Sequence, residues 1–519
     1  MRVEEFLENS ARQHPHKVAL VANNSRLTYA ELNQSANRFA HALRLNGVQR
    51  DDRVVVFLDN STEAVVGIFG ALKASAVFSV INPTTKPEKL AYILNNCRAI
   101  ATLTHARLLA PIGEALKSVP WVKTTFVVEA VDKMAIPGAI SFEQSLEDAS
   151  SSAQRQQGID MDLAMIIYTS GSTGMPKGVM MTHANVDAAA TSITTYLENT
   201  SDDVILNALP LAFDYGLYQV LMSCKLGGTI VLEKSFAFPY QVLQRIDSEN
   251  VTGFPIVPTM AAILLQLKDL SPGRFPHLRY ITNTAAALPV SHISRLQKLF
   301  PMTRIFSMYG LTECKRCTYL PPEQLSIRPD SVGVAIPNTE ACVVNDLGEP
   351  VKPGEVGTLV IRGDHIMKGY WENPEATDRM LRPGRYPWEK VLYTGDLFRA
   401  DDDGYLYFVG RSDDIIKSRG EKVSPTEVEN VIYKLPSVSE VAVIGLPDPI
   451  LGTAIKAVIV PVTGATLDEH EILSHCSKHL EDYMVPKFVE FRSNLPKTDS
   501  GKIRRRAVQE ESLSVESTR

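Results

Sequence analysis

A segment of small, hydroxyl-bearing and flexible residues, 168–178, carries the first chemical signal in the chain. It reads Tyr-Thr-Ser-Gly-Ser-Thr-Gly-Met-Pro-Lys-Gly and follows the apolar run 163–167, which predicts a strand that ends in a loop. Glycines let backbone N–H groups approach an anion, and the hydroxyls and the lysine add donors and charge. The pattern favours a polyphosphate-binding loop over an ordinary glycine-rich turn. Its members are Thr169, Ser170, Gly171, Ser172, Thr173, Gly174 and Lys177.

This phosphate loop differs from a Walker loop at the residue that follows its lysine. A Walker loop places a Ser or Thr hydroxyl there to hold magnesium, whereas this chain has Gly178 after Lys177. Any magnesium ligand must therefore lie elsewhere in the chain.

Length and composition predict a globular protein with two or more domains. The chain has 519 residues, of which 45% are hydrophobic and 22% are charged, whereas single domains usually hold ~100 to ~200 residues. A net charge of −6 gives no general attraction to nucleic acid or to anionic membranes. The N-terminus shows no basic stretch followed by an apolar segment, and no apolar run is long enough to span a bilayer. We therefore expect a cytoplasmic protein whose partners are small molecules or other proteins.

Cysteines and histidines give two weak signals for metal or redox chemistry. Six cysteines are scattered along the chain, which favours free thiols in a reducing compartment. Cys314 and Cys317 form a Cys-x-x-Cys pair, but no second pair completes a zinc site. His475 and His479 lie one helical turn apart in residues 467–480, whose pattern is that of an amphipathic helix with a polar face. Metal binding is disfavoured for both groups.

Short β-rich runs alternate with helix-length amphipathic segments over the first two thirds of the chain. Such runs occur at residues 53–58, 229–232, 254–257 and 279–282. This alternation predicts an α/β fold with layered, mostly parallel sheets that are covered by helices.

The pattern changes at about residue 341 to strands that are closed by turns. We therefore assign residues 1–411 to a large N-terminal domain, whose β-rich subdomain covers about 341–411. The polar stretch Gly-Arg-Ser-Asp-Asp at 410–414 breaks the chain there, and the elements beyond it predict a small α+β C-terminal domain over residues 412–519.

Four further motifs follow the phosphate loop. They are Met-Tyr-Gly-Leu-Thr-Glu at 308–313, Tyr-Thr-Gly-Asp at 393–396, Gly-Arg-Ser-Asp-Asp-Ile-Ile-Lys at 410–417 and Pro-Lys-Thr-Asp-Ser-Gly-Lys at 496–502. Together, the loop and these motifs resemble the adenylate-forming, or AMP-binding, superfamily, which includes acyl-CoA synthetases, adenylation domains of peptide synthetases and firefly luciferase. The resemblance extends from Leu27 to Lys502 and implies that the small C-terminal domain is mobile.

The resemblance implies an ATP-dependent, AMP-forming carboxylate ligase. In such enzymes a substrate carboxylate attacks the α-phosphate of ATP, which releases pyrophosphate and leaves an acyl-adenylate, and a thiol then displaces AMP to give a thioester. The first step needs anions to be positioned and their repulsion to be neutralised, rather than a general base. The implied cofactors are ATP and Mg²⁺, and the simplest thiol is coenzyme A.

Two other kinds of protein share part of this pattern. The phosphopantetheine arm of a carrier protein ends in the same thiol as coenzyme A, so a free-standing enzyme that loads an amino acid or related acid onto a carrier protein is the alternative. A nucleotide-binding protein without catalysis is disfavoured because Lys177, Glu313, Asp396, Arg411 and Lys502 occur together. No motif favours a luciferase-like oxidation.

The resemblance also implies roles for the residues of the middle motifs. Glu313 would coordinate magnesium, Thr312 would contact phosphate and Tyr309 would pack on the adenine. Asp396 would accept the ribose hydroxyls, which suits a carboxylate with two acceptor oxygens, and Arg411 would hold the edge of the ribose or phosphate. A structural alternative is that Thr312 and Glu313 cap a helix.

Lys502 matches the family's adenylation lysine. That lysine reaches into the large domain, bridges the substrate carboxylate and the α-phosphate, and leaves when the small domain rotates for the thiol step. A long, flexible cation suits this task, whereas the alternative is a solvated lysine in the basic run that ends at Arg506. Asp413 matches the hinge of the rotation, and Gly420 matches the glycine that lines the route of the thiol.

The acid substrate is less clearly encoded. Many acyl-CoA synthetases have a histidine at the position of Phe213, and the pair Phe213-Asp214 is closer to amino-acid-activating domains, in which an aspartate binds the substrate ammonium. A buried carboxylate is costly unless it is paired, so either a substrate amine or Arg316 could pair with Asp214. A small or medium acid is favoured over a long acyl chain. The acyl pocket would consist of Phe213, Asp214, Tyr218, Asn283, Met308, Arg316 and Cys317.

Overall fold

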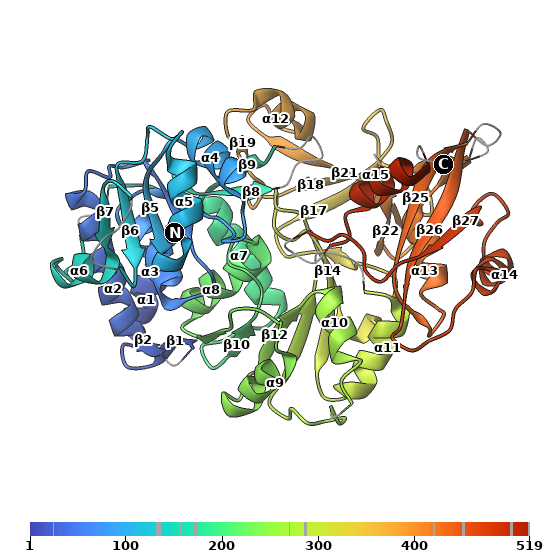
Figure 1. The fold of residues 1–519 in the computed structure, drawn as a ribbon, viewed down its shortest axis with the longest axis horizontal. Helices are drawn as coiled ribbons and strands as arrows, with labels where there is room; N and C mark the ends of the chain where they lie inside the picture. Colours follow the sequence, from blue (N-terminus) through green and yellow to red (C-terminus); the bar gives the residue numbers. More distant parts are fainter. Residues whose placement is uncertain are drawn as a thin grey trace.

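The computed structural model describes residues 1–519 except 24, 131–135, 155–156, 170–174, 269, 285–287, 413, 419–420, 449–451, 499–501 and 517–519. The described chain forms mixed α/β layers in a large N-terminal domain, and a small C-terminal domain, coloured red, lies beside it (Figure 1). The predicted fold class is confirmed.

The largest sheet has nine strands in the spatial order β16-β15-β14-β13-β12-β10-β11-β1-β2. The strands from β14 to β1 run parallel, and the outer strands β16, β15 and β2 are antiparallel to their neighbours. The strands are β1 (Val18–Ala22), β2 (Ser25–Thr28), β10 (Val204–Asn207), β11 (Thr229–Leu232), β12 (Gly253–Ile256), β13 (Tyr280–Asn283), β14 (Arg304–Tyr309), β15 (Thr318–Leu320) and β16 (Val334–Ala335).

A second sheet has eight strands in the order β19-β9-β8-β4-β3-β5-β6-β7. It is parallel from β8 to β7, and its strand β3 is a run of β-branched and aromatic residues buried almost throughout, as is typical of central parallel strands. The strands are β3 (Arg53–Phe57), β4 (Val77–Val80), β5 (Ala99–His105), β6 (Thr124–Val128), β7 (Ala139–Ser141), β8 (Leu163–Thr169), β9 (Lys177–Thr182) and β19 (Gly369–Tyr370).

Helices pack the two parallel sheets into one core. Helix α2 packs on α3, and helices α1 and α7 pack on α8, whose residues Asp214 to Cys224 are all buried. A capping box starts α2, because Thr28 and Glu31 satisfy each other's backbone N–H groups. The helices of this domain are α1 (Glu4–Gln13), α2 (Tyr29–Leu45), α3 (Thr62–Lys73), α4 (Pro87–Asn96), η1 (Ala106–Leu108), α5 (Leu109–Leu116), α6 (Phe142–Glu147), α7 (His183–Tyr196), α8 (Asp214–Leu226), α9 (Pro239–Ser248), α10 (Pro258–Leu264), α11 (Val290–Leu299), η2 (Pro322–Gln324) and α12 (Pro374–Met380).

The β-rich section predicted from about residue 341 forms an antiparallel sheet of five strands. Its strands are β17 (Glu340–Val344), β18 (Gly357–Arg362), β20 (Leu381–Pro383), β21 (Lys390–Ala400) and β22 (Leu406–Arg411). Strand β22 ends at Arg411, and the next strand begins at Ile416, so the domain boundary that we predict at residue 412 falls between two elements.

The C-terminal domain has apolar clusters of its own, which include Val428, Ile432, Val443 and Ile459. Strand β26 pairs antiparallel with β25 and parallel with β27, and helix α13 packs on β25 and α14. The elements are β23 (Ile416–Ser418), β24 (Glu421–Val423), α13 (Pro425–Ile432), β25 (Val438–Asp448), β26 (Gly452–Pro461), α14 (Glu469–His479), β27 (Phe488–Phe491) and α15 (Arg505–Glu516). In the part of the chain that the structure describes, no helix combines the length and the apolar character that crossing a membrane requires.

Candidate active site

The phosphate loop joins two antiparallel strands. It leaves β8 at Thr169 and enters β9 at Lys177, and these two residues face each other in the strand register. Five of the residues that we assign to phosphate binding, 170–174, lie outside the described chain. What the structure places is the root of the loop, and with it Lys177.

Lys177 and Glu313 both lie next to Tyr370, a residue that the sequence reasoning did not identify. The ammonium of Lys177 lies 5.3 Å from the centre of the Tyr370 ring. The Tyr370 hydroxyl donates a 2.6 Å hydrogen bond to Oε1 of Glu313. Strand β19 brings Tyr370 there, because it pairs with β9 and sets Tyr370 opposite Val179. Tyr370 therefore orients the carboxylate for which we predict a magnesium contact.

Replacing Tyr370 by phenylalanine should slow pyrophosphate release about 10- to 100-fold, since a hydrogen bond to a charged group is worth about 1.5–3 kcal/mol. The Mg²⁺ concentration for half-maximal rate should rise as well, because the freed carboxylate is less well oriented. Tyr407→Phe is the control, since its hydroxyl donates to Asp401 at 3.0 Å. A Tyr370→Phe enzyme with an unchanged Mg²⁺ requirement would contradict the assigned role.

A tight turn carries Thr312 and Glu313 between β14 and β15. It contains no helix, so the helix-capping alternative for these residues is wrong. A Cβ on Gly310 would lie 2.0 Å from the Lys315 carbonyl oxygen and 2.9 Å from the Arg316 Cα, so the turn closes only on glycine. Lys315 itself has a φ of 67°, in the left-handed region.

Gly310→Ala should therefore displace the turn and cost roughly 100-fold or more in ATP–pyrophosphate exchange, because misplacement by about 1 Å can have that effect. The melting temperature should fall too, because backbone atoms must move to accept the methyl group. Gly113→Ala is the matched control, since the nearest atom to its Cβ, in Ile136, is 3.4 Å away. Normal exchange by Gly310→Ala would disprove the importance of this close approach.

The predicted ribose contacts lie opposite each other on two neighbouring strands. Asp396 of β21 pairs in register with Arg411 of β22. Arg411 Nε donates to Asp396 Oδ1 at 3.0 Å, and the Tyr309 hydroxyl donates to Oδ2 at 2.5 Å. Burial raises the pKa of Asp396, whereas Arg411 and Tyr309 lower it. The carboxylate is thus held from both sides and keeps lone pairs for further donors.

The Tyr309 ring belongs to an aromatic cluster that the sequence reasoning did not foresee. Its centroid lies 4.9 Å from that of Phe398 and 6.2 Å from that of Phe408. Phe398 comes two residues after Asp396 on the same face of β21, so the period-two alternation of a strand could have predicted it. The adenine contact of Tyr309 remains a prediction.

Lys502 of the C-terminal domain reaches this site. A short hairpin presents it: Lys497 pairs with Ile503, and the Thr498 N–H donates to the Lys502 carbonyl at 2.8 Å. The side chain keeps exposed surface, yet desolvation and the Arg411 guanidinium lower its pKa, whereas the carboxylates Asp214, Asp396 and Glu313 raise it. Charges act on each other over several ångströms, so the small domain brings its lysine within electrostatic range of the candidate nucleotide and acid contacts.

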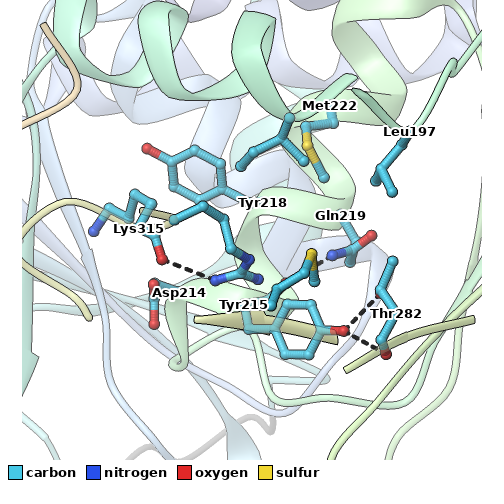
Figure 2. A pocket seen from close by; sticks show the side chains of 11 residues that line it. Leu197, Asp214, Tyr215, Tyr218, Gln219, Met222, Thr282 and Lys315 are labelled. Carbon is cyan, nitrogen blue, oxygen red and sulfur yellow. Dashed lines mark hydrogen bonds between the residues drawn. The ribbon is translucent and has the colours of Figure 1, made fainter. Parts of the chain in front are cut away.

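A pocket is lined by residues of α7 and its C-terminal end, of α8, β13 and β14, and of the segment 315–316. Figure 2 shows Asp214 and Lys315 on one side of it and Leu197, Gln219 and Thr282 on the other. Only about 10 Å³ of it can hold the centre of a water molecule, within about 290 Å³ of space between the atoms that includes open solvent. The full lining is Ile193, Leu197, Asp214, Tyr215, Tyr218, Gln219, Met222, Thr282, Met308, Lys315 and Arg316.

Four of the seven predicted acyl-pocket residues line this pocket, namely Asp214, Tyr218, Met308 and Arg316. The other three lie elsewhere. Phe213 packs edge-on against Tyr215, Asn283 is buried at the end of β13, and Cys317 lies with its sulfur 3.1 Å from that of Cys314. Their contact with an acid therefore stays a prediction.

The residues that the sequence reasoning missed follow from helical spacing. On α8, positions 215, 219 and 222 share a face with 214 and 218, which the 3.6-residue period could have indicated. The adjacent residue Lys315 joins the pocket only because of its left-handed backbone, which no sequence pattern announced. The predicted hinge residue Asp413 and thiol-channel residue Gly420 lie outside the described residues.

Asp214 and Arg316 do not pair with each other. Neither a hydrogen bond nor an ion pair joins their side chains, both of which the structure describes. Asp214 is the first residue of α8, where the helix dipole stabilises a negative charge. The Arg316 guanidinium instead stacks 4.4 Å above the Tyr215 ring and donates from Nη1 to the Lys315 carbonyl at 2.9 Å.

A large α/β domain whose site receives a lysine from a small C-terminal domain is the architecture of adenylate-forming enzymes. Residues 7–371 match the family model of the AMP-binding enzymes, and residues 427–502 match that of the AMP-binding enzyme C-terminal domain. The chain therefore belongs to the AMP-binding enzyme family, as its motifs predicted.

Curated relatives align with nearly the whole chain. A long-chain-fatty-acid–CoA ligase from Bacillus subtilis (strain 168) is 31% identical over 98% of this chain and 94% of its own length. A feruloyl-CoA synthase from Amycolatopsis sp is 35% identical over 95% of each chain. With these relatives, the family identifies this chain as an AMP-forming ligase that joins an acid to a thiol.

Solved structures share the fold at similar identity. The anthranilate CoA ligase AuaEII in complex with anthranoyl-AMP has a TM-score of 0.90 and 28% identity, covering 99% of this chain and 98% of its own. ATP-bound MatB from Rhodopseudomonas palustris has a TM-score of 0.88 and 28% identity, covering 99% and 100%. The acids in the names of these relatives differ widely, so the acid of this chain must be argued from its own pocket.

Proposed function

We propose that this enzyme activates a small carboxylic acid with ATP and Mg²⁺ as an acyl-adenylate and transfers the acyl group to coenzyme A. Lys502 carries the proposal, because this cation of the small domain is close enough for the charges of Asp214, Glu313 and Asp396 to act on it. That arrangement suits the adenylation step, in which two anions must approach each other.

Each residue has a task in this reaction that its geometry supports. Asp396 and Arg411 hold the ribose, with Tyr309 fixing the second carboxylate oxygen. Lys177 and the phosphate loop hold the pyrophosphate that departs. Lys502 neutralises the repulsion between the substrate carboxylate and the α-phosphate, and it withdraws with the small domain before the thiol enters.

Glu313 fits the role of a magnesium ligand. Tyr370 occupies one of its carboxylate oxygens, and the second oxygen is available to a cation. Magnesium is usually bound by one or two carboxylates together with substrate phosphates. Among the described residues, no group of three or more His, Cys, Asp or Glu could hold a metal ion. When bound, the ion neutralises charge on the phosphates.

Coenzyme A is the acceptor that the relatives favour, since those at 31% and 35% identity are named CoA ligases or synthases. One observation favours the alternative, an enzyme that loads an amino acid onto a carrier protein. Asp214 matches the aspartate that binds the substrate ammonium in amino-acid-activating domains. Arg316 does not pair with Asp214 but bonds to the Lys315 carbonyl, so the carboxylate stays available to an amine. The two functions differ in both the acid and the thiol.

A screen of pyrophosphate release against carboxylic acids and amino acids, with and without coenzyme A, tests the proposal. We expect simple acids to be turned over in a coenzyme A-dependent manner, with acyl-CoA detected by chromatography. Turnover of amino acids without CoA thioester, together with loading of a phosphopantetheinylated carrier protein, would establish the alternative instead.

A further inference from the structure

We propose that the acid substrate carries a second carboxylate, which is bound inside the acyl pocket by Arg316 and Tyr218. This inference rests on the proposed function, because it names the class of acid for the same adenylation site. It comes from polar groups that are buried in this pocket and that the protein itself leaves unpaired.

Arg316 presents a fixed and unpaired donor to the pocket. Its residue is 4% exposed, and the stacking on Tyr215 and the bond to the Lys315 carbonyl hold the guanidinium in place. Nε is buried, and no atom of the described residues accepts a hydrogen bond from it. Arginine stays charged at every physiological pH, so this group remains a buried cation that lacks a carboxylate partner.

Tyr218 provides a second donor one helical turn along α8 from Asp214. It is 2% exposed, and its hydroxyl is buried with no hydrogen-bond partner among the described residues. Tyr218 and Arg316 both line the pocket, and Figure 2 shows the Tyr218 hydroxyl at the end of its ring that lies away from Gln219 and Thr282. Two buried donors without acceptors are the complement of an oxygen-bearing ligand, and buried polar groups in proteins are otherwise almost always paired.

The charges of the pocket distinguish a carboxylate from an amine. The lining contains two cations, Lys315 and Arg316, and one anion, Asp214. No ion pair joins Asp214 to Arg316, so the lining holds two cations against one carboxylate and, among the described residues, the guanidinium has no carboxylate in contact. A second carboxylate on the substrate would balance it, whereas a substrate ammonium would add a further positive charge to the buried set.

The substrate's reacting carboxylate is a separate group. It belongs near Lys502, whose charge Asp214, Asp396 and Glu313 influence. Nε of Arg316, with the neighbouring Nη2, forms the side of a guanidinium that binds a carboxylate with two parallel hydrogen bonds. The pocket is narrow, since only about 10 Å³ of it can hold the centre of a water molecule, so a short acid is favoured over a long one.

Acids of equal length with different terminal groups test the proposal. Pyrophosphate release and CoA thioester formation would be measured with succinate, butyrate, 4-aminobutyrate and 4-hydroxybutyrate, and with the corresponding sets based on glutarate and adipate. We expect the best diacid to exceed its methyl-terminated and amino-terminated counterparts about 10³-fold in kcat/KM, because sites with buried donors reject analogues that leave them unpaired. The 2-amino acids of the same length should be no better than the methyl-terminated acids.

Substitutions then connect this preference to the two donors. Arg316→Met should lower kcat/KM for the best diacid by about 10²-fold or more and narrow its advantage over the methyl-terminated acid, and Arg316→Lys should recover part of it. Tyr218→Phe should reduce the preference for the diacid less strongly. Arg382→Met is the matched control, because its guanidinium lies 4.0 Å above the Tyr393 ring on an exposed strand.

The possible failures are distinguishable. If the wild-type enzyme releases pyrophosphate with none of the acids tested, here or in the wider screen, the proposed function fails. If monocarboxylic, hydroxy or amino acids are turned over as well as the diacids or better, only the present inference is overturned. The same holds if Arg316→Met keeps the full preference for a diacid, because the second carboxylate is then recognised elsewhere.

Discussion

Lys502→Ala should abolish ATP–pyrophosphate exchange, with a loss of about 10³-fold or more, while thioester formation from a supplied acyl-adenylate remains near the wild-type rate. Three carboxylates of the large domain, Asp214, Asp396 and Glu313, act on the charge of Lys502. The positive charge is needed when the substrate carboxylate meets the α-phosphate, and the thiol step has no such pair of anions. Rapid-quench assays of each half-reaction measure the two effects separately.

The control for this variant lies in the same hairpin. Lys497→Ala removes a lysine whose Nζ pairs with Glu440 at 2.5 Å, within the small domain. It should leave both half-reactions intact and lower stability at most slightly, since ion pairs of this kind contribute little. Equal loss of both half-reactions in Lys502→Ala would show that the lysine supports the fold or the domain contact instead of the adenylation step.

Asp396→Asn should lower kcat/KM for ATP by about 10²- to 10³-fold, mainly through a higher KM. The amide keeps the size of the side chain, but it turns an N–H₂ group toward Tyr309 or Arg411, both of which already donate to this position. The ribose hydroxyls thus lose a charged acceptor, and a hydrogen bond to a charged group is worth about 1.5–3 kcal/mol. Equilibrium binding of ATP or AMP by calorimetry checks the result without requiring the acid.

Asp401→Asn separates nucleotide binding from stability. Asp401 also accepts from a tyrosine and an arginine, Tyr407 at 3.0 Å and Arg328 at 3.1 Å. The two substitutions should lower the melting temperature to a comparable degree, whereas only Asp396→Asn should weaken nucleotide binding. If both variants bind AMP like the wild type, Asp396 has a structural role only.

Linear patterns predicted much of this molecule because they reflect local physics. The run at 53–58 is β-branched and apolar because both faces of a central parallel strand are buried, and the structure has β3 at Arg53–Phe57. The expected amphipathic helix at 467–480 is α14, Glu469–His479. The motif residues Asp396 and Arg411 are opposite each other because a hairpin of two strands sets a register.

Contacts between distant segments could not be predicted in the same way. Tyr370 touches Glu313 across 57 residues of chain, and only the pairing of β19 with β9 brings it there. Whether Asp214 pairs with Arg316 likewise depends on the direction of the Arg316 side chain. That side chain follows the left-handed residue Lys315 and stacks on Tyr215. Neither of these contacts is indicated by a sequence motif or by a periodic pattern of residues.

The tight turn after Gly310 has a consequence for how such an enzyme can change its substrate. Glu313, to which we assign the magnesium contact, and Arg316, to which we assign the acid, are three residues apart on one tight turn. A substitution at Arg316 therefore risks displacing Glu313. Changes in acid selectivity that are made on this turn should lower the turnover number. Helix α8 carries no nucleotide contact that we assign. Substitutions on α8 can therefore change which acid is bound without disturbing the residues that we assign to ATP.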